Sequence, residues 1–117
     1  MAYDLFENLG FLDTQVTRIQ TLSGSVEMTF SELDEACFQL RFFGVVFLEH
    51  FYLRRIEDWI VSDDSREIQN ARDFLTRADC AELMDANKSL RQLTLLDDRS
   101  LPMLQIVFRD CQLVAGG

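Results

Sequence analysis

The chain has 117 residues and a formal net charge of −9, from 20 acidic and 11 basic side chains. Hydrophobic residues make up 48% of it and ten residues are Phe, which excludes a chain too polar to fold and predicts one globular domain, 1–117, with an aromatic-rich core. The negative charge repels phosphate backbones and anionic membranes, so we expect neither nucleic acid nor membrane as a partner, whereas a basic protein would be attracted.

The first predicted elements are a short helix and a β-hairpin. Residues 2–9 place apolar side chains at helical spacing, and Gly10 suits the position after a helix. From Val16 to Leu22 the chain is rich in Thr and β-branched residues, Ser23–Ser25 supplies turn residues, and Val26–Phe30 alternates apolar and polar side chains. This pattern predicts a hairpin with one face in the core.

The most apolar stretch, from Cys37 to Leu53, follows a period of two and predicts long β-structure. Gly44 lies in its middle, where glycine marks a bulge, a sharp bend or a turn between two paired strands. After Gly44 both parities are mostly apolar, so coverage on both faces is expected. We therefore expect the central strand of the fold here.

A short strand or turn around Trp59 follows. Asp64 and Glu67 then resemble a helix capping box, and apolar residues over 64–78 fall at helical spacing, which predicts the main helix. A further short helical turn is predicted at 79–84.

The last part of the chain returns to β-structure. Residues 93–95 and 104–108 alternate, the polar turn Asp97–Ser100 separates them, and Pro102 suits a strand start or edge. The whole pattern predicts an α+β, mainly β fold: an antiparallel sheet or sandwich of about five to seven strands with one main helix packed on it.

The cysteines indicate a reducing compartment. Cys37, Cys80 and Cys111 are odd in number and widely spaced, unlike the dense, even sets of secreted disulfide-bonded domains. Residues 1–8 carry acidic side chains and no basic leader, and no apolar run is long enough to span a bilayer. A cytoplasmic location is expected.

No group of residues predicts catalysis, a metal or a cofactor. The only histidine, His50, lies among aromatic residues, and a catalytic role would require a nucleophile or carboxylate beside it. The isolated cysteines do not form a metal-binding pattern and are expected to pack as small apolar residues. Paired acids occur at four places and are expected in solvated turns or at a helix start: Asp34-Glu35, Glu57-Asp58, Asp63-Asp64 and Asp97-Asp98.

The aromatic residues allow one binding hypothesis. Rings on strands can line a pocket for a small apolar ligand in a β-rich domain. The candidate lining residues are Phe38, Phe42, Phe47, His50, Phe51 and Trp59. Core packing is the competing explanation, since a small domain needs such rings to fill its interior.

Three segments carry a resemblance to a known group of proteins. They are Leu12-Asp13-Thr14 followed by Val16, Arg18 and Ile19; the strand Val26–Phe30; and Leu40–Val45 with its Arg-Phe-Phe-Gly. This arrangement resembles small uncharacterised bacterial β-rich proteins, some of which are described as immunity proteins of toxin systems. The resemblance implies a non-enzymatic, partner-binding protein of the bacterial cytosol, and it implies no functional residue.

Three classes of function follow. The leading one is a protein-interaction module, with an immunity role toward a basic partner as its most specific form. The second is binding of a small apolar ligand among the phenylalanines, and the third is an enzyme, which requires His50 or a cysteine to meet an acid in a cleft. A homodimer formed through an exposed strand edge is compatible with all three.

Overall fold

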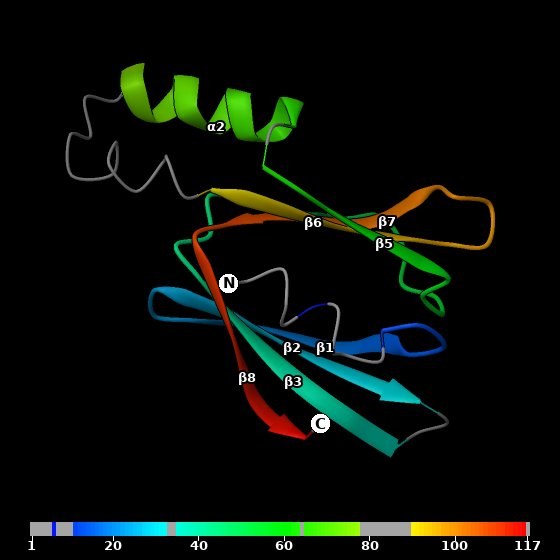
Figure 1. Ribbon diagram of the computed structural model, residues 1–117. Coiled ribbons are helices and arrows are strands. Elements are labelled where there is room, and N and C mark those ends of the chain that lie inside the picture. Colours follow the sequence, from blue (N-terminus) through cyan, green and yellow to red (C-terminus); the bar gives the residue numbers. More distant parts are fainter. Residues whose placement is uncertain (1–5, 7–10, 33–34, 64, 78–89, 117) are drawn as a thin grey trace.

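The described chain contains eight strands and one helix. The computed structural model describes residues 6, 11–32, 35–63, 65–77 and 90–116, and the statements below concern these residues. The elements are β1 (Gln15–Leu22), β2 (Ser25–Glu32), β3 (Glu35–Phe43), β4 (Phe47–His50), β5 (Asp58–Ser62), α2 (Arg66–Arg77), β6 (Arg91–Leu96), β7 (Pro102–Phe108) and β8 (Asp110–Gly116). A first sheet of order β1-β2-β3-β8 and a second of order β4-β7-β6-β5, both antiparallel, stack face to face (Figure 1). The fold is mainly β, as predicted.

The predicted N-terminal hairpin is present. Leu22 lies opposite Ser25, so the connection between β1 and β2 is the two-residue loop Ser23-Gly24. Gly24 has a φ of 79°, as two-residue hairpin turns require. The apolar positions of the alternating pattern in β2 form its buried face: Val26, Met28 and Phe30 are all buried in the core.

The most apolar stretch of the sequence forms the two strands β3 and β4, and the chain bends at Gly44 between them. The chain leaves the first sheet after β3 and enters the second sheet as β4, while its antiparallel partner passes from β7 to β8 at the same place. There the Arg109 N–H donates to the Phe43 carbonyl at 2.9 Å, and the Val46 N–H donates to the Val107 carbonyl at 3.0 Å. Gly44 has a φ of 63°, and a Cβ on it would lie 2.7 Å from the Cβ of Arg109. A glycine is therefore required at this bend.

The prediction of a central strand is right for β3 and wrong for β4. β3 lies between β2 and β8, whereas β4 is an edge strand of the second sheet. Leu48 packs against the core and Phe47 packs on the opposite face, so both faces are covered at the start of β4, while Glu49 and His50 are exposed. The apolar pattern correctly predicted that both faces of β4 are covered at its start, but it did not predict that β4 lies at the edge of its sheet.

The core fills the space between the two sheets. Its buried side chains include Met28, Phe30, Phe38, Leu40 and Phe42 from the first sheet and Leu93, Leu95, Leu104, Ile106 and Phe108 from the second. The rings of Phe30 and Phe38 stack with centroids 4.8 Å apart, and Phe42 meets Phe108 edge-on at 5.0 Å. Burial of one such side chain contributes roughly 1.5–3 kcal/mol, so these aromatic contacts account for much of the stability of the sandwich.

Helix α2 begins at a serine cap. The Ser65 hydroxyl accepts a hydrogen bond from the Ile68 N–H at 3.1 Å, as an N-cap residue does. The predicted cap, Asp64, lies outside the described residues. Among the side chains of α2 that the structure describes, Ile68 alone is buried, in a small cluster with Leu90 and Val107 on the outer face of the second sheet. The prediction of one main helix packed on the sheet is therefore not confirmed.

The strand count also differs from the prediction. We expected about five to seven strands, and the structure has eight because Asp110–Gly116 forms β8, which the sequence pattern did not indicate. Of the helix predicted at 2–9, only Phe6 is described, and it is helical and fully buried. The turn predicted at 79–84 lies outside the described residues. No helix in the described part of the chain is long and apolar enough to cross a membrane.

Candidate functional site

Three connecting segments meet at one end of the sandwich. We call this region the loop end and define it as residues 11–14, 51–57 and 97–101, at the right of Figure 1. Backbone hydrogen bonds join the first two segments: the Asp13 N–H donates to the Ile56 carbonyl at 3.0 Å, and the Ile56 N–H donates to the Thr14 carbonyl at 2.7 Å. These bonds fix the segments relative to each other, although neither is a strand.

One carboxylate holds the third segment in place. Asp97 is 3% exposed. Its Oδ1 accepts hydrogen bonds from the Arg99 N–H at 2.8 Å and the Leu101 N–H at 2.9 Å, which closes the turn between β6 and β7. Its Oδ2 accepts a hydrogen bond from the Tyr52 hydroxyl, so the second segment is tied to the third. Both oxygens of Asp97 are therefore occupied by donors.

These bonds change the pKa values of both partners. The hydrogen bond from Tyr52 is the largest cause that lowers the pKa of Asp97 from 3.8 to about 2, and the N–H groups of Leu101 and Arg99 act in the same direction. The same bond to Asp97 raises the pKa of Tyr52 above its usual 10.0. Asp97 thus stays ionised, and both of its oxygens are already occupied by hydrogen-bond donors. This arrangement suits a structural role and not proton transfer.

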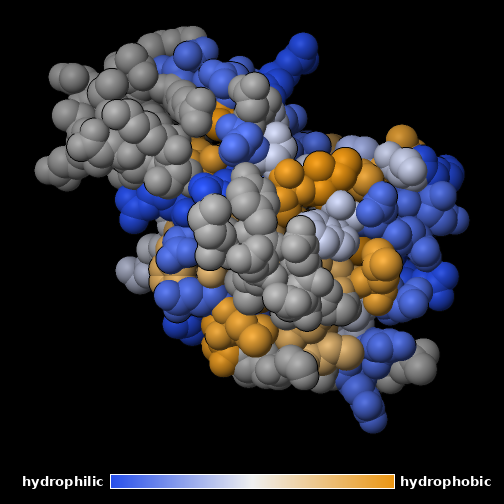
Figure 2. All heavy atoms as spheres, in the orientation of Figure 1, coloured by the Kyte–Doolittle hydropathy of each residue, from blue (hydrophilic) through white to orange (hydrophobic). Residues whose placement is uncertain are grey.

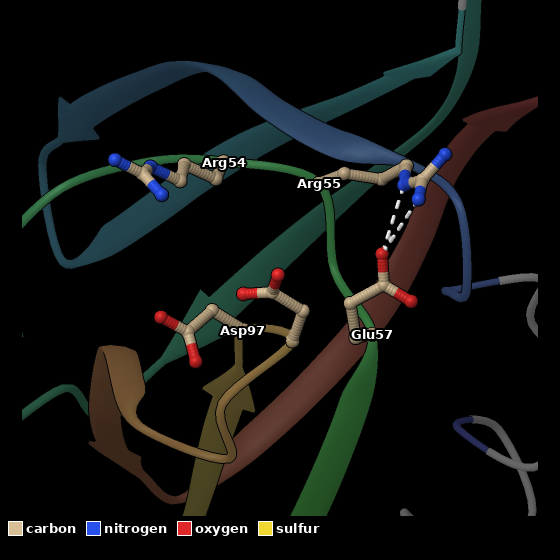
Figure 3. Close-up of a pocket in the computed structure, with 5 residues that line it drawn as sticks. Arg54, Arg55, Glu57 and Asp97 are labelled. Carbon is tan, nitrogen blue, oxygen red and sulfur yellow. Dashed lines mark hydrogen bonds and ion pairs between the residues drawn. The ribbon is translucent and has the colours of Figure 1, made fainter.

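A polar cleft of about 190 Å³ opens beside this network. Arg54, Arg55, Glu57, Asp97 and Asp98 line it (Figure 3). Arg55 is held by Glu57, with its Nη2 and Nε each 2.9 Å from Glu57 Oε1. The Arg54 guanidinium lies 5.4 Å from the centre of the Tyr52 ring. Both signs of charge thus line this cleft, unlike the mainly apolar lining of a typical small-ligand pocket.

The loop end also exposes large apolar side chains. Phe51 is 56% exposed, Leu12 is 53% exposed and Leu101 is 46% exposed, so each of the three segments contributes one. In Figure 2 apolar residues reach the surface between polar ones. Exposed apolar groups bordered by polar groups are typical of interaction sites.

The six residues predicted to line an apolar pocket lie in different environments. Phe38 and Phe42 are buried in the core, Phe47 is half-buried beside α2, Trp59 is half-buried at the core, and His50 and Phe51 are exposed at the end of β4. Phe11 joins two of them, with its ring 5.7 Å from that of Phe38 and 5.6 Å from that of Trp59. The structure does not gather all six around one space, and a pocket among them stays a prediction.

The candidates for catalysis are also dispersed. Among the described residues, no hydrogen bond or ion pair is made by the side chain of His50, whose backbone pairs with that of Leu104 in the second sheet. Burial is the larger of two causes that raise the pKa of the Cys111 thiol to about 12, and Asp110 adds to it, which disfavours the nucleophilic thiolate. Cys37 is a half-buried free thiol, and Cys80 lies outside the described residues. Among the described residues, no group of three or more His, Cys, Asp or Glu side chains can hold a metal ion.

The sequence pattern missed the role of Asp97. It predicted a polar turn at Asp97–Ser100, which is present, and it wrongly predicted that both acids of the pair are solvated. Asp98 is exposed, whereas Asp97 is buried under its own turn and bonded to Tyr52. An Asp that opens a turn can accept backbone N–H groups within that turn, and this is the signal that favours burial of the first acid.

The loop end is therefore defined by its geometry, and the comparisons with known proteins add nothing to it. No protein-family model matches the chain, and no curated protein or solved structure matches it. The arrangement itself is a fixed surface of mixed charge with exposed apolar groups.

Proposed function

We propose that this chain is a non-enzymatic protein-interaction module that binds a basic partner protein through the loop end. The observation that carries the proposal is the exposure of Leu12, Phe51 and Leu101 on three segments that hydrogen bonds hold in fixed positions. Burial of such side chains on binding supplies affinity, and their fixed backbone reduces the entropy lost on association.

The charge of this region favours a basic partner. The loop end and the adjoining start of β5 carry the carboxylates of Asp13, Glu57, Asp58, Asp97 and Asp98 against the guanidinium groups of Arg54, Arg55 and Arg99. Two of these arginines are paired internally, Arg55 with Glu57 and Arg99 with Asp97. The local excess of acid has the same sign as the net charge of −9, so the chain attracts cationic surfaces both at long range and at this site.

The most specific form of the proposal is an immunity-type role. A protein that neutralises a basic toxin domain needs a preformed surface of opposite charge and no chemistry of its own. The resemblance of the Leu12–Ile19, Val26–Phe30 and Leu40–Val45 segments to bacterial β-rich proteins supports this form and a cytoplasmic location.

Affinity capture with matched variants tests the proposal. We expect the tagged wild-type chain to retain a basic protein from the native lysate at low salt and to lose it at high salt. The double variant Phe51→Ser and Leu101→Ser should lose the same protein, while Ile60→Ser, which removes a similarly exposed side chain from β5, should keep it. Equal capture by all three proteins, or no capture at any salt, would overturn the proposal.

A second experiment distinguishes the immunity role from other interactions. The captured partner is expressed in bacteria with the wild-type chain, with the double variant or alone. An immunity role predicts that the partner stops growth when expressed alone and that the wild-type chain restores growth, while the double variant does not. A partner that is harmless alone would remove the immunity form and leave the interaction module in place.

A further inference from the structure

Two charged groups that line the cleft at the loop end have no ion-pair partner within the described part of the chain. Arg55 is paired with Glu57 at 2.9 Å, and both oxygens of Asp97 accept hydrogen bonds. Among the described residues, no hydrogen bond or ion pair is made by the side chain of Arg54 or of Asp98. In Figure 3 the Arg54 guanidinium points away from the pair of Arg55 and Glu57. The cleft therefore offers one cation and one anion to another molecule.

These two charges are carried by connected parts of the loop end. The Arg54 guanidinium lies 5.4 Å from the centre of the Tyr52 ring, and the Tyr52 hydroxyl donates a hydrogen bond to Asp97, which precedes Asp98. The turn that carries Asp98 is closed by the Leu101 N–H, which donates to Asp97 Oδ1 at 2.9 Å, and by the Asp97 N–H, which donates to the Leu101 carbonyl at 3.0 Å. A ring contact and a hydrogen bond thus link the cation to the turn of the anion, so the two are presented together.

We propose that the basic partner presents an acidic and a basic side chain side by side to this cleft, the acidic one to Arg54 and the basic one to Asp98. This inference rests on the proposed function and specifies the surface that the loop end recognises. A guanidinium binds a carboxylate through two parallel hydrogen bonds, and a carboxylate accepts hydrogen bonds from Lys or Arg. The partner is then basic as a whole and mixed in charge where it touches the cleft.

A uniformly cationic surface fits the cleft less well. It would place a like charge against Arg54, which costs affinity. A chain with a net charge of −9 attracts cationic proteins in general. An exposed cation at the point of contact discriminates between them, because a partner without an acid at that place leaves the cation unpaired.

The neighbours of the two charges favour a protein surface over a small ion. Leu101 closes the turn that carries Asp98 and is 46% exposed, and Phe51 precedes Tyr52 and is 56% exposed. A small ion would leave these apolar side chains in water, whereas a protein surface buries them together with the charges.

Neutral substitutions in the cleft test the proposal. The probe is the basic protein that the tagged wild-type chain retains, purified after its identification by mass spectrometry. Asp98→Asn should weaken its binding about fivefold, as loss of one ion pair does. Arg54→Gln should also weaken it about fivefold, although loss of one basic residue changes the net charge from −9 to −10. Net attraction alone predicts the opposite for Arg54→Gln, which is equal or tighter binding. Isothermal titration calorimetry at fixed salt measures the dissociation constants.

Two control proteins separate the local pair from the net charge. Arg66→Gln makes the same change of charge at an exposed residue at the start of α2, outside the loop end, and should bind at least as tightly as the wild type. The double variant Arg54→Gln and Asp98→Asn keeps the net charge of −9 and should bind more weakly than either single variant. Circular dichroism of each variant confirms that it is folded.

The outcomes distinguish this inference from the proposed function. Wild-type or tighter binding by Arg54→Gln, no effect of Asp98→Asn, or an equal loss with Arg66→Gln would overturn the mixed-charge contact. The proposed function would then still stand if the Phe51→Ser and Leu101→Ser double variant loses the same protein. Retention of no protein by the wild-type chain would overturn both.

Discussion

The interior of the sandwich and the loop end are stabilised in different ways. In the interior, rings such as Phe42 and Phe108 contact each other between the sheets and are fully buried. At the loop end, backbone bonds and one buried carboxylate hold three segments in place, while Phe51 and Leu101 remain exposed. The apolar residues that stabilise the fold are thus separate from those available to a partner, so stability and binding can be changed independently.

The two regions also differ in how they respond to pH. The aromatic rings carry no ionisable group, so the contribution of the interior does not change with pH. The loop end depends on an ionised Asp97 and a protonated Tyr52. Acid and alkali should therefore loosen the loop end before they affect the interior.

The largest expected effect is loss of a central ring. Phe108→Ala removes contacts with Phe6 at 6.0 Å and Phe42 at 5.0 Å between ring centroids, and it should lower the free energy of unfolding by roughly 3–5 kcal/mol. Urea denaturation measures the loss. The loss should be the same near neutral pH as at mildly acidic pH, and a strong pH dependence would contradict an apolar origin.

The bend at Gly44 is expected to tolerate substitution less than the hairpin loop. Gly44→Ala combines a φ of 63° with a contact of 2.7 Å to the Arg109 Cβ, and it should cost roughly 2–3 kcal/mol. Gly24→Ala is the matched control, because its φ is 79° and nothing lies within 4 Å of the added carbon; it should cost roughly 1 kcal/mol. Equal losses in urea denaturation would show that the close approach to Arg109 has no effect.

Removal of the charge of Asp97 tests the loop end. The pKa of Asp97 is lowered from 3.8 to about 2 in the fold, so its stabilisation is present above pH 3.8 and is lost as the pH falls toward 2. Asp97→Asn should lower Tm near neutral pH, and its Tm should approach that of the wild type near pH 2. Thermal melts over this range measure the effect.

The matched control is the neighbouring acid. Asp98→Asn makes the same change of charge at an exposed position, so its Tm near neutral pH should stay close to that of the wild type. Equal effects of the two substitutions would assign the loss to net charge and not to the hydrogen bonds of Asp97.

The difference between the two regions also explains which parts of the fold the sequence predicted. Burial of one face imposes alternation, and alternation correctly predicted β2, much of β3 and β7. It missed β8 because Gln112, Leu113 and Val114 are all exposed on an edge strand, so no buried parity is visible in their sequence. Gly44 indicated a bend, but the assignment of β3 and β4 to different sheets depends on pairing with β7 and β8, which are distant in the sequence.

The candidate site was less predictable for a related reason. Its geometry depends on contacts between segments such as that of Tyr52 with Asp97, which are 45 residues apart. The pair Asp97-Asp98 indicated a turn, and the place of Asp97 at the start of that turn favours its burial, but local sequence does not show its bond to Tyr52. The sequence also did not predict that Phe51 is exposed, because a Phe in an apolar run is usually buried.

Among these substitutions, Phe51→Ser is expected to change stability least and binding most. Phe51→Ser changes a side chain that is 56% exposed, so the free energy of unfolding should change by less than about 0.5 kcal/mol. Capture of the basic partner should nevertheless weaken, because an exposed aromatic side chain contributes to affinity when a partner buries it. Urea denaturation and capture on the same protein sample measure both. If Phe51→Ser destabilised the fold as strongly as Phe108→Ala, Phe51 would belong to the core, and the separation between the two regions would not hold.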